Sequence, residues 1–131
     1  MIGLDSNVVV RYLAQGDAVQ SAKATQLFEH GLTEEEPGFV SVVTMAETAG
    51  VLERIYGLTA GELAAAIERM LEVNVLVVEN EQEVFTAMTA VKEGRGSFAD
   101  ALIGALGVKM GCSHTVTFDQ KALRLPEFQL L

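Results

Sequence analysis

Four acidic residues in this sequence stand apart from the other charges. Each is the only charged side chain in a stretch of ten or more residues, whereas most of the other acids lie in charge-rich segments. The four are Asp5, Glu47, Asp100 and Asp119. Removing an unpaired carboxylate from water costs several kcal/mol, so acids in apolar surroundings need a physical reason to be there.

The chemistry that four such carboxylates would share is the binding of a hard metal ion. Converging negative charges raise one another's pKa, so they stay ionised together only around a cation. Oxygen ligands with no neighbouring His or Cys suit Mg²⁺ or Mn²⁺. A metal held in this way activates water and stabilises the charge that develops in phosphodiester cleavage. Asp5, which interrupts the apolar opening of the chain, is therefore predicted to be a metal ligand.

Helix capping is the competing explanation for each of these acids. Thr44 and Glu47, like Ser97 and Asp100, have the spacing of a capping box, in which the third helical residue reaches back to the N-cap amide. Asp5 would cap the first helix, and Asp119 would form an Asx-turn. The same box spacing occurs at two further sites that look like plain caps, Thr59 with Glu62 and Asn80 with Glu83.

Short apolar runs alternate with longer amphipathic ones along the whole chain. This alternation predicts one α/β domain over residues 1–131, with a parallel sheet of about five strands flanked by helices on both faces. The predicted strands are Ile2–Leu4, Phe39–Val43, Val75–Val78, Thr115–Phe118 and Phe128–Leu130. The predicted helices are Val8–Ala14, Ala18–Gly31, Met45–Tyr56, Ala60–Glu72, Glu81–Glu93 and Phe98–Met110, with a short turn near Lys121.

The order of these elements places the four acids at one edge of the predicted sheet. Parallel strands share a direction, and ligands of such sheets collect at the carboxyl ends of the strands. Asp5 and Asp119 each follow a strand, and Glu47 lies in the first turn after the second strand. The helix that contains Asp100 runs antiparallel to the strand it precedes, so its first turn is expected at the same edge. We therefore expect the four carboxylates to converge.

The segments around these acids resemble the PIN-domain nucleases, and among them the VapC-type toxins of toxin–antitoxin pairs. The matching segments are "IGLDSNVVVRYL", "VSVVTMAETAGVLE", "FADALIGALGVKMGC" and "TVTFDQKALRLP". The resemblance implies that Asp5, Glu47, Asp100 and Asp119 bind the catalytic metal and that Asn7 and Thr117 support the site. Many relatives have an aspartate where Ser97 stands here. Serine is itself a good N-cap, so Ser97 can replace that aspartate as a helix cap, if not as a carboxylate.

The resemblance also implies a sequence-selective endoribonuclease, an antitoxin partner of the VapB type and homodimerisation. The formal net charge of −9 and the absence of a basic patch argue, by themselves, against a nucleic-acid partner. Bound Mg²⁺ would reduce this charge and attract RNA phosphate. Arg11 and Arg95, next to the predicted edge, are candidates for contacts with flanking phosphates. An acidic edge would also attract a basic antitoxin segment.

The rest of the composition limits where the protein works. No apolar stretch approaches the ~20 residues of a membrane span, so no membrane association is expected. Cys112 is the only cysteine, which excludes an internal disulfide and fits the cytoplasm.

Two other phosphoryl chemistries fit part of the pattern. A haloacid-dehalogenase-type phosphatase would use Asp5 as its nucleophile, but it needs an acid two residues later, where Asn7 stands. A receiver-like phosphorylation switch would need a phosphoacceptor aspartate after the third strand, where this chain has Glu79.

Overall fold

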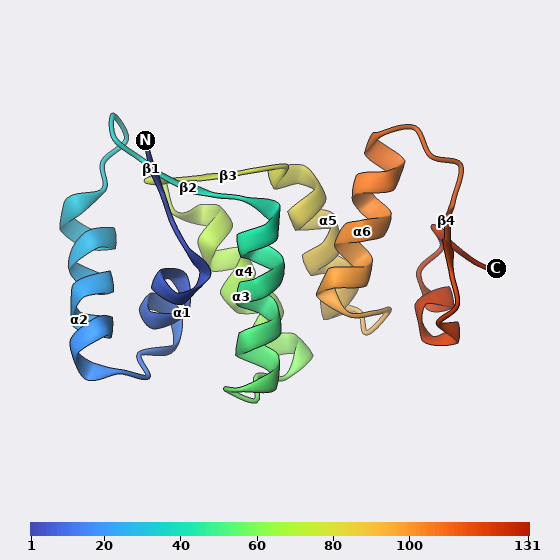
Figure 1. Ribbon diagram of the computed structural model, residues 1–131, viewed down its shortest axis with the longest axis horizontal. Helices are drawn as coiled ribbons and strands as arrows, with labels where there is room; N and C mark the ends of the chain where they lie inside the picture. The colour runs from blue at the N-terminus through green and yellow to red at the C-terminus, as the bar shows by residue number, and fades with distance from the viewer.

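The computed structural model describes residues 1–131 as an elongated molecule with its strands in two separate sheets (Figure 1). The first, called sheet A here, holds β1 (Ile2–Gly3), β2 (Gly38–Val40) and β3 (Leu76–Val78) in the order β1-β2-β3. Both pairs are parallel. Strand β2 therefore lies in the middle of sheet A, and β1 forms one of its edges.

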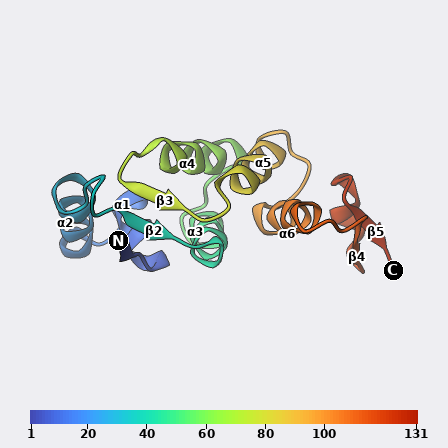
Figure 2. The ribbon, with the colours of Figure 1, turned by 90° about the horizontal axis from the view of Figure 1, so that it is seen from above.

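The second sheet, sheet B, contains β4 (Thr115–Thr117) and β5 (Phe128–Leu130), which are also parallel. A 3₁₀ helix at Gln120–Arg124, η2, connects them and corresponds to the turn predicted near Lys121. Both views place sheet B towards the C-terminal end of the molecule, with α5 and α6 between it and sheet A (Figures 1 and 2). The predicted α/β class with five parallel strands is confirmed, and the strands are divided between two sheets.

Helices make up most of the remaining chain, and their bounds follow the predicted ones closely. They are α1 (Ser6–Ala14), α2 (Ala18–Gln26), α3 (Val42–Arg54), α4 (Ala60–Glu72), α5 (Glu81–Lys92) and α6 (Phe98–Lys109). The predicted helix over 18–31 ends in a π-helical turn, η1 (Leu27–Gly31). None of the helices combines the length and apolar character needed to cross a membrane.

The start of α3 differs from the prediction. The sequence pattern continued strand β2 to Val43, whereas β2 ends at Val40 and α3 begins at Val42. The reason is Ser41, whose side chain accepts a hydrogen bond from the Thr44 N–H and so caps the helix. Thr44 therefore lies inside the first turn and is not the N-cap.

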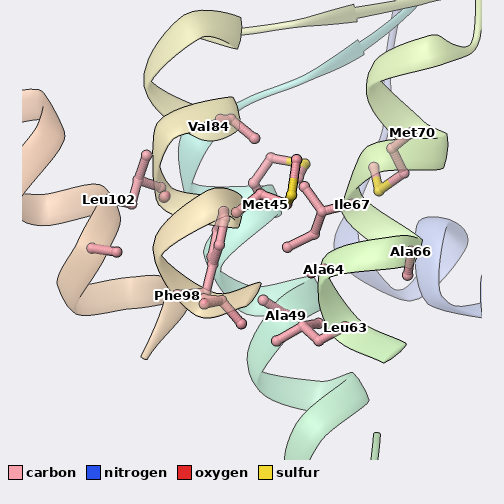
Figure 3. Packing of buried hydrophobic residues seen from close by; sticks show 14 of the residues in the cluster. Met45, Ala49, Leu63, Ala64, Ala66, Ile67, Met70, Val84, Phe98 and Leu102 are labelled. Carbon is pink, nitrogen blue, oxygen red and sulfur yellow. The ribbon is translucent and has the colours of Figure 1, made fainter. Parts of the chain in front are cut away.

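The core is built mainly from helix contacts around α3, α4, α5 and α6. Phe98 of α6 is fully buried in one cluster with Met45, Leu63 and Val84, which come from the other three helices (Figure 3). Burying a side chain of this size contributes about 2–3 kcal/mol. Because Phe98 is the first residue of α6, this packing fixes the end of the helix that carries Asp100.

A smaller contact holds α1 to the segment after α2. The rings of Tyr12 and Phe28 stack with their centroids 4.1 Å apart and their planes 4° from parallel. Aromatic pairs of this kind add about 0.5–1.5 kcal/mol beyond the area that they bury. The stack therefore fixes the position of α1 relative to η1.

Candidate metal centre

Asp5 stands between β1 and α1. The Leu4 N–H donates to the Phe39 carbonyl, which holds the end of β1 against β2. Asp5 then takes an extended conformation as the N-cap of α1, and its Oδ1 accepts from the Ser6 N–H at 2.8 Å. The predicted capping role is therefore present. It uses one carboxylate oxygen and leaves Oδ2 free on an exposed side chain.

Glu47 is linked to this same turn through Ser6. The Ser6 Oγ donates to Glu47 Oε2 at 2.8 Å, while the Ser6 N–H is bonded to Asp5. A second contact, from Thr44 Oγ1 to the Leu4 carbonyl at 3.3 Å, ties α3 to the end of β1. The structure thus brings Asp5 and Glu47 together, one on either side of Ser6.

The position of Glu47 excludes the capping-box explanation. The helix is capped by Ser41, so Glu47 lies beyond the first turn of α3 and has no N-cap amide within reach. Its carboxylate instead accepts a hydrogen bond from the Ser6 hydroxyl. The Thr44–Glu47 spacing was misleading because Ser41, three residues before Thr44, is an equally good N-cap.

Asp100 lies in the first turn of α6, and Ser97 is the N-cap. The Ser97 Oγ accepts from the Asp100 N–H at 3.1 Å, but the Asp100 carboxylate accepts no hydrogen bond from the Ser97 N–H. Half of the capping box is therefore formed, and the carboxylate itself has no protein partner. Ser97 performs the capping role expected of it.

Asp119 follows β4 in sheet B. Thr117 Oγ1 accepts from the Asp119 N–H at 3.0 Å, and Asp119 Oδ1 accepts from the Lys121 N–H at 2.9 Å. The Asx-turn that the sequence suggested is present, while the role of Thr117 at a metal site stays a prediction. As with Asp5, one carboxylate oxygen remains without a partner.

The four carboxylates do not form one cluster within the chain. No three side chains among its His, Cys, Asp and Glu residues lie close enough together to hold a metal ion. The expectation of a single sheet edge is not met, because β4 pairs only with β5 and does not extend sheet A. Sequence patterns give the direction of parallel strands, but they do not give which strands are neighbours.

The two arginines predicted to contact phosphate already have protein partners. The Arg11 guanidinium donates to Gln20 at 2.8 Å and to the Tyr56 hydroxyl at 2.7 Å, joining α1 to α2 and to the segment after α3. Arg95 forms an ion pair with Glu93 at 2.9 Å. Asn7 is exposed in the first turn of α1 and makes no side-chain hydrogen bond.

The chemistry of the donors fits a hard divalent cation. None of the four acids takes part in an ion pair, since the three ion pairs of the chain use Glu36, Glu83 and Glu93. Each of the four keeps at least one oxygen without a protein partner. Asp5 and Glu47 therefore present carboxylate oxygens on either side of Ser6, which are the donors that Mg²⁺ and Mn²⁺ prefer.

A family model described as the PIN domain matches residues 2–127 of the 131-residue chain. The chain belongs to the PIN-domain family. The resemblance seen in the sequence is confirmed at this level, and membership of the PIN family indicates a metal-dependent nuclease. No curated protein matches the chain. The assignment of Asp5, Glu47, Asp100 and Asp119 as ligands stays a prediction.

Sequence reasoning missed two polar contacts that shape this PIN domain. The sequence pattern did not single out Ser6, yet this residue donates to both Asp5 and Glu47. Glu79, just after β3, accepts from the Val42 N–H at 2.9 Å and so holds the first turn of α3. The serine directly after Asp5 was the available signal for the first contact, and only the pairing of β2 with β3 reveals the second.

Proposed function

We propose that this PIN domain is a Mg²⁺- or Mn²⁺-dependent endoribonuclease, the toxin of a VapBC-type pair. The observation that carries the proposal is the set of four carboxylates without ion pairs, two of them joined through Ser6, in a chain of the PIN family. The four carboxylates are exposed or half-buried and have no counter-charge on the protein, and a divalent cation would supply one.

The residues of the proposed site have different roles in binding the metal. Asp5 and Glu47 would bind the metal through their free oxygens, with Asp100 and Asp119 completing the set. Ser6 orients both nearby acids, since its N–H and its hydroxyl each donate to one of them. When bound, the metal supplies an activated water and neutralises the charge that develops on the scissile phosphate. RNA is the proposed substrate.

The arginines have different prospects as phosphate contacts. Arg11 would reach a phosphate only through the donors not used by Gln20 and Tyr56. Arg95 shares an exposed ion pair, which is worth little and is easily exchanged. We therefore assign the stronger phosphate contact to Arg95.

An antitoxin of the VapB type is the proposed inhibitor. A segment with a basic side chain would neutralise the acids that the metal otherwise occupies, and the net charge of −9 favours such a partner. Binding should weaken with rising salt concentration and with Glu47→Gln. A complex indifferent to both would place inhibition elsewhere on the surface.

The direct test is incubation of purified, antitoxin-free protein with total RNA, followed by mapping of the cut ends. Cleavage with Mg²⁺ or Mn²⁺, and none with EDTA, is expected. Asp5→Asn should lower the rate about 10²-fold or more, because each ligand helps to position the metal. Intact RNA under all conditions would refute the proposal. Stable phosphorylation by acetyl phosphate would instead favour the receiver or phosphatase chemistry.

A further inference from the structure

Among the unpaired outer edges of the two sheets, those of β1 and β4 have main-chain groups that can pair with each other. In β1, Ile2 and Leu4 donate their N–H groups to β2, so the N–H and C=O of Gly3 between them point away from sheet A. In β4, Thr115 and Thr117 bond to the β5 side, so the main chain of Val116 points away from sheet B. Each sheet thus presents an open parallel edge, which readily adds another strand.

Three apolar side chains on or next to these edges are exposed. Ile2 is 40% exposed, Val116 is 53% exposed and Phe118 is 81% exposed. A strand of a parallel sheet is normally covered on both faces, which is why such strands are apolar throughout. Ile2, Val116 and Phe118 therefore suit the interior of a larger sheet, whereas the single chain leaves them at its surface.

Sheet B cannot reach β1 of its own chain without losing its present packing. Leu125 is buried against Gly96, just before α6, and Phe128 is buried against Gly104 within α6. The packing is tight, because a Cβ added at those glycines would lie 2.8 Å from Leu125 and 3.1 Å from Phe128. Helix α6 is in turn held by Phe98 in the main core (Figure 3).

We infer that two copies of this chain pair β1 of each with β4 of the other, so that Asp119 of the partner subunit completes the site of Asp5 and Glu47. With Thr117 opposite Gly3, the Gly3 N–H would meet the Val116 carbonyl and the Phe118 N–H would meet the Gly3 carbonyl. The same register sets Asp119 opposite Asp5, on strands about 4.8 Å apart.

The assembly has the geometry of a closed dimer. The elongated shape places sheets A and B at different positions along the molecule, so two copies related by a two-fold axis can exchange both contacts at once (Figures 1 and 2). The result is a five-stranded parallel sheet made from β3, β2 and β1 of one subunit and β4 and β5 of the other. The assembly follows from the strand edges alone, while its shared active site rests on the proposed function.

Cross-linking between single-cysteine chains tests the assembly without reference to activity. Cys112 is first replaced by serine, and one chain then carries Gly3→Cys and the other Thr117→Cys. A Cβ at Gly3 meets no atom within 4 Å, so the first change fits the fold. A short bismaleimide should give a covalent dimer from the mixture and none from either chain alone. A mixture that yields no dimer overturns the inference, as does a chain with both changes that cross-links only within itself.

Proline variants test the same edge by the mass of the particle in solution. Wild type should have twice the 14.0 kDa mass of the chain. Val116→Pro removes the outward N–H of β4 and should leave a monomer with unchanged circular dichroism. Leu130→Pro is the matched control on the far edge of β5 and should stay dimeric. A monomeric wild type, or a Val116→Pro variant that stays dimeric, contradicts the inference.

Mixing inactive variants tests whether the site is shared. Asp5→Asn and Asp119→Asn chains should complement, because their mixed dimer keeps one intact site. Random exchange gives about a quarter of the wild-type activity, since half of the dimers are mixed and each has one good site. Asp5→Asn with Glu47→Gln is the control, because both changes affect the same half-site and no dimer is repaired. If wild type cuts RNA but the first mixture stays inactive, the shared site is refuted. If wild type does not cut RNA, the proposed function fails and the cross-link still decides the assembly.

Discussion

The first turns of α4 and α6 have the same sequence spacing and use it differently. Thr59 and Ser97 both cap their helices by accepting from the amide three residues later. In α4, the Glu62 carboxylate also accepts from the Thr59 N–H at 2.9 Å, which completes the capping box. In α6, the Asp100 carboxylate makes no such bond. An identical local pattern thus leaves one acid engaged in the backbone and the other free for a ligand.

The largest expected difference between the two acids is in catalysis. Asp100→Asn should lower RNA cleavage about 10²-fold or more, because a metal ligand is lost. Glu62→Gln should leave the rate unchanged, since that side chain is satisfied within its own helix turn. Cleavage of a defined RNA under single-turnover conditions measures both. Equal rates for the two variants would contradict the assignment of Asp100, but not Glu62, as a metal ligand.

The second-largest expected difference between Asp100 and Glu62 is in how strongly metal stabilises their variants. Bound metal increases the free energy of unfolding by RT ln(1 + [L]/Kd), on the order of 1–3 kcal/mol at excess metal, and so raises the melting temperature. Asp100→Asn should shrink this increase because Kd rises, and Glu62→Gln should keep it. Melting curves with Mn²⁺ and with EDTA provide the measurement. The metal-site assignment of Asp100 fails if its variant responds to metal like the Glu62 control.

Removing the capping hydroxyls should have a smaller effect on stability. Ser97→Ala and Thr59→Ala each remove one side-chain cap, at a cost of about 1 kcal/mol. The loss should be larger for Thr59→Ala, because the hydrogen bond from the Thr59 N–H to the Glu62 carboxylate depends on the same turn. Urea unfolding of both variants measures the difference. A larger loss for Ser97→Ala would mean that the α6 cap has partners beyond its own helix.

The smallest expected effect is on the pH dependence of stability. The hydrogen bond from the Thr59 N–H lowers the pKa of Glu62 from its usual 4.5. A carboxyl with a depressed folded pKa stabilises the protein above its unfolded pKa and loses that contribution as the pH falls. Glu62→Gln should therefore flatten the decline of stability below about pH 4.5. Unfolding curves between pH 5 and pH 3 detect the change, and an unaltered slope would contradict it.

Local patterns predicted the elements well where one signal dominated. The bounds of α4 and of β5 match the prediction, because α4 has a full capping box and β5 a short apolar run. The start of α3 was missed because two hydroxyl residues competed as caps and Ser41 prevailed. At Asn80 the predicted cap is absent: the residue has a left-handed conformation and makes no capping hydrogen bond.

The sequence singled out the candidate residues but could not show how they lie relative to one another. Isolation among apolar neighbours singled out the four acids, and the structure confirms that none is neutralised by an ion pair. The separation of Asp119 from Asp5 depends on which strands pair, which is decided by packing such as that of Leu125 against Gly96. The partners of Arg11 were likewise beyond the sequence, since Tyr56 is 45 residues away.

The contacts that the two tyrosines make in and around α1 allow intrinsic fluorescence to report on the N-terminal part of the molecule. It has no tryptophan and two tyrosines, so Tyr12 and Tyr56 supply its intrinsic fluorescence. Tyr12 stacks on Phe28, and the Tyr56 hydroxyl is bonded to Arg11, so both chromophores sense α1 and its immediate neighbours. Sheet B contains neither. Tyrosine emission will therefore follow the N-terminal part of the molecule, and circular dichroism will follow all of it. Coincident transitions in the two signals would show that the two sheets unfold as one unit.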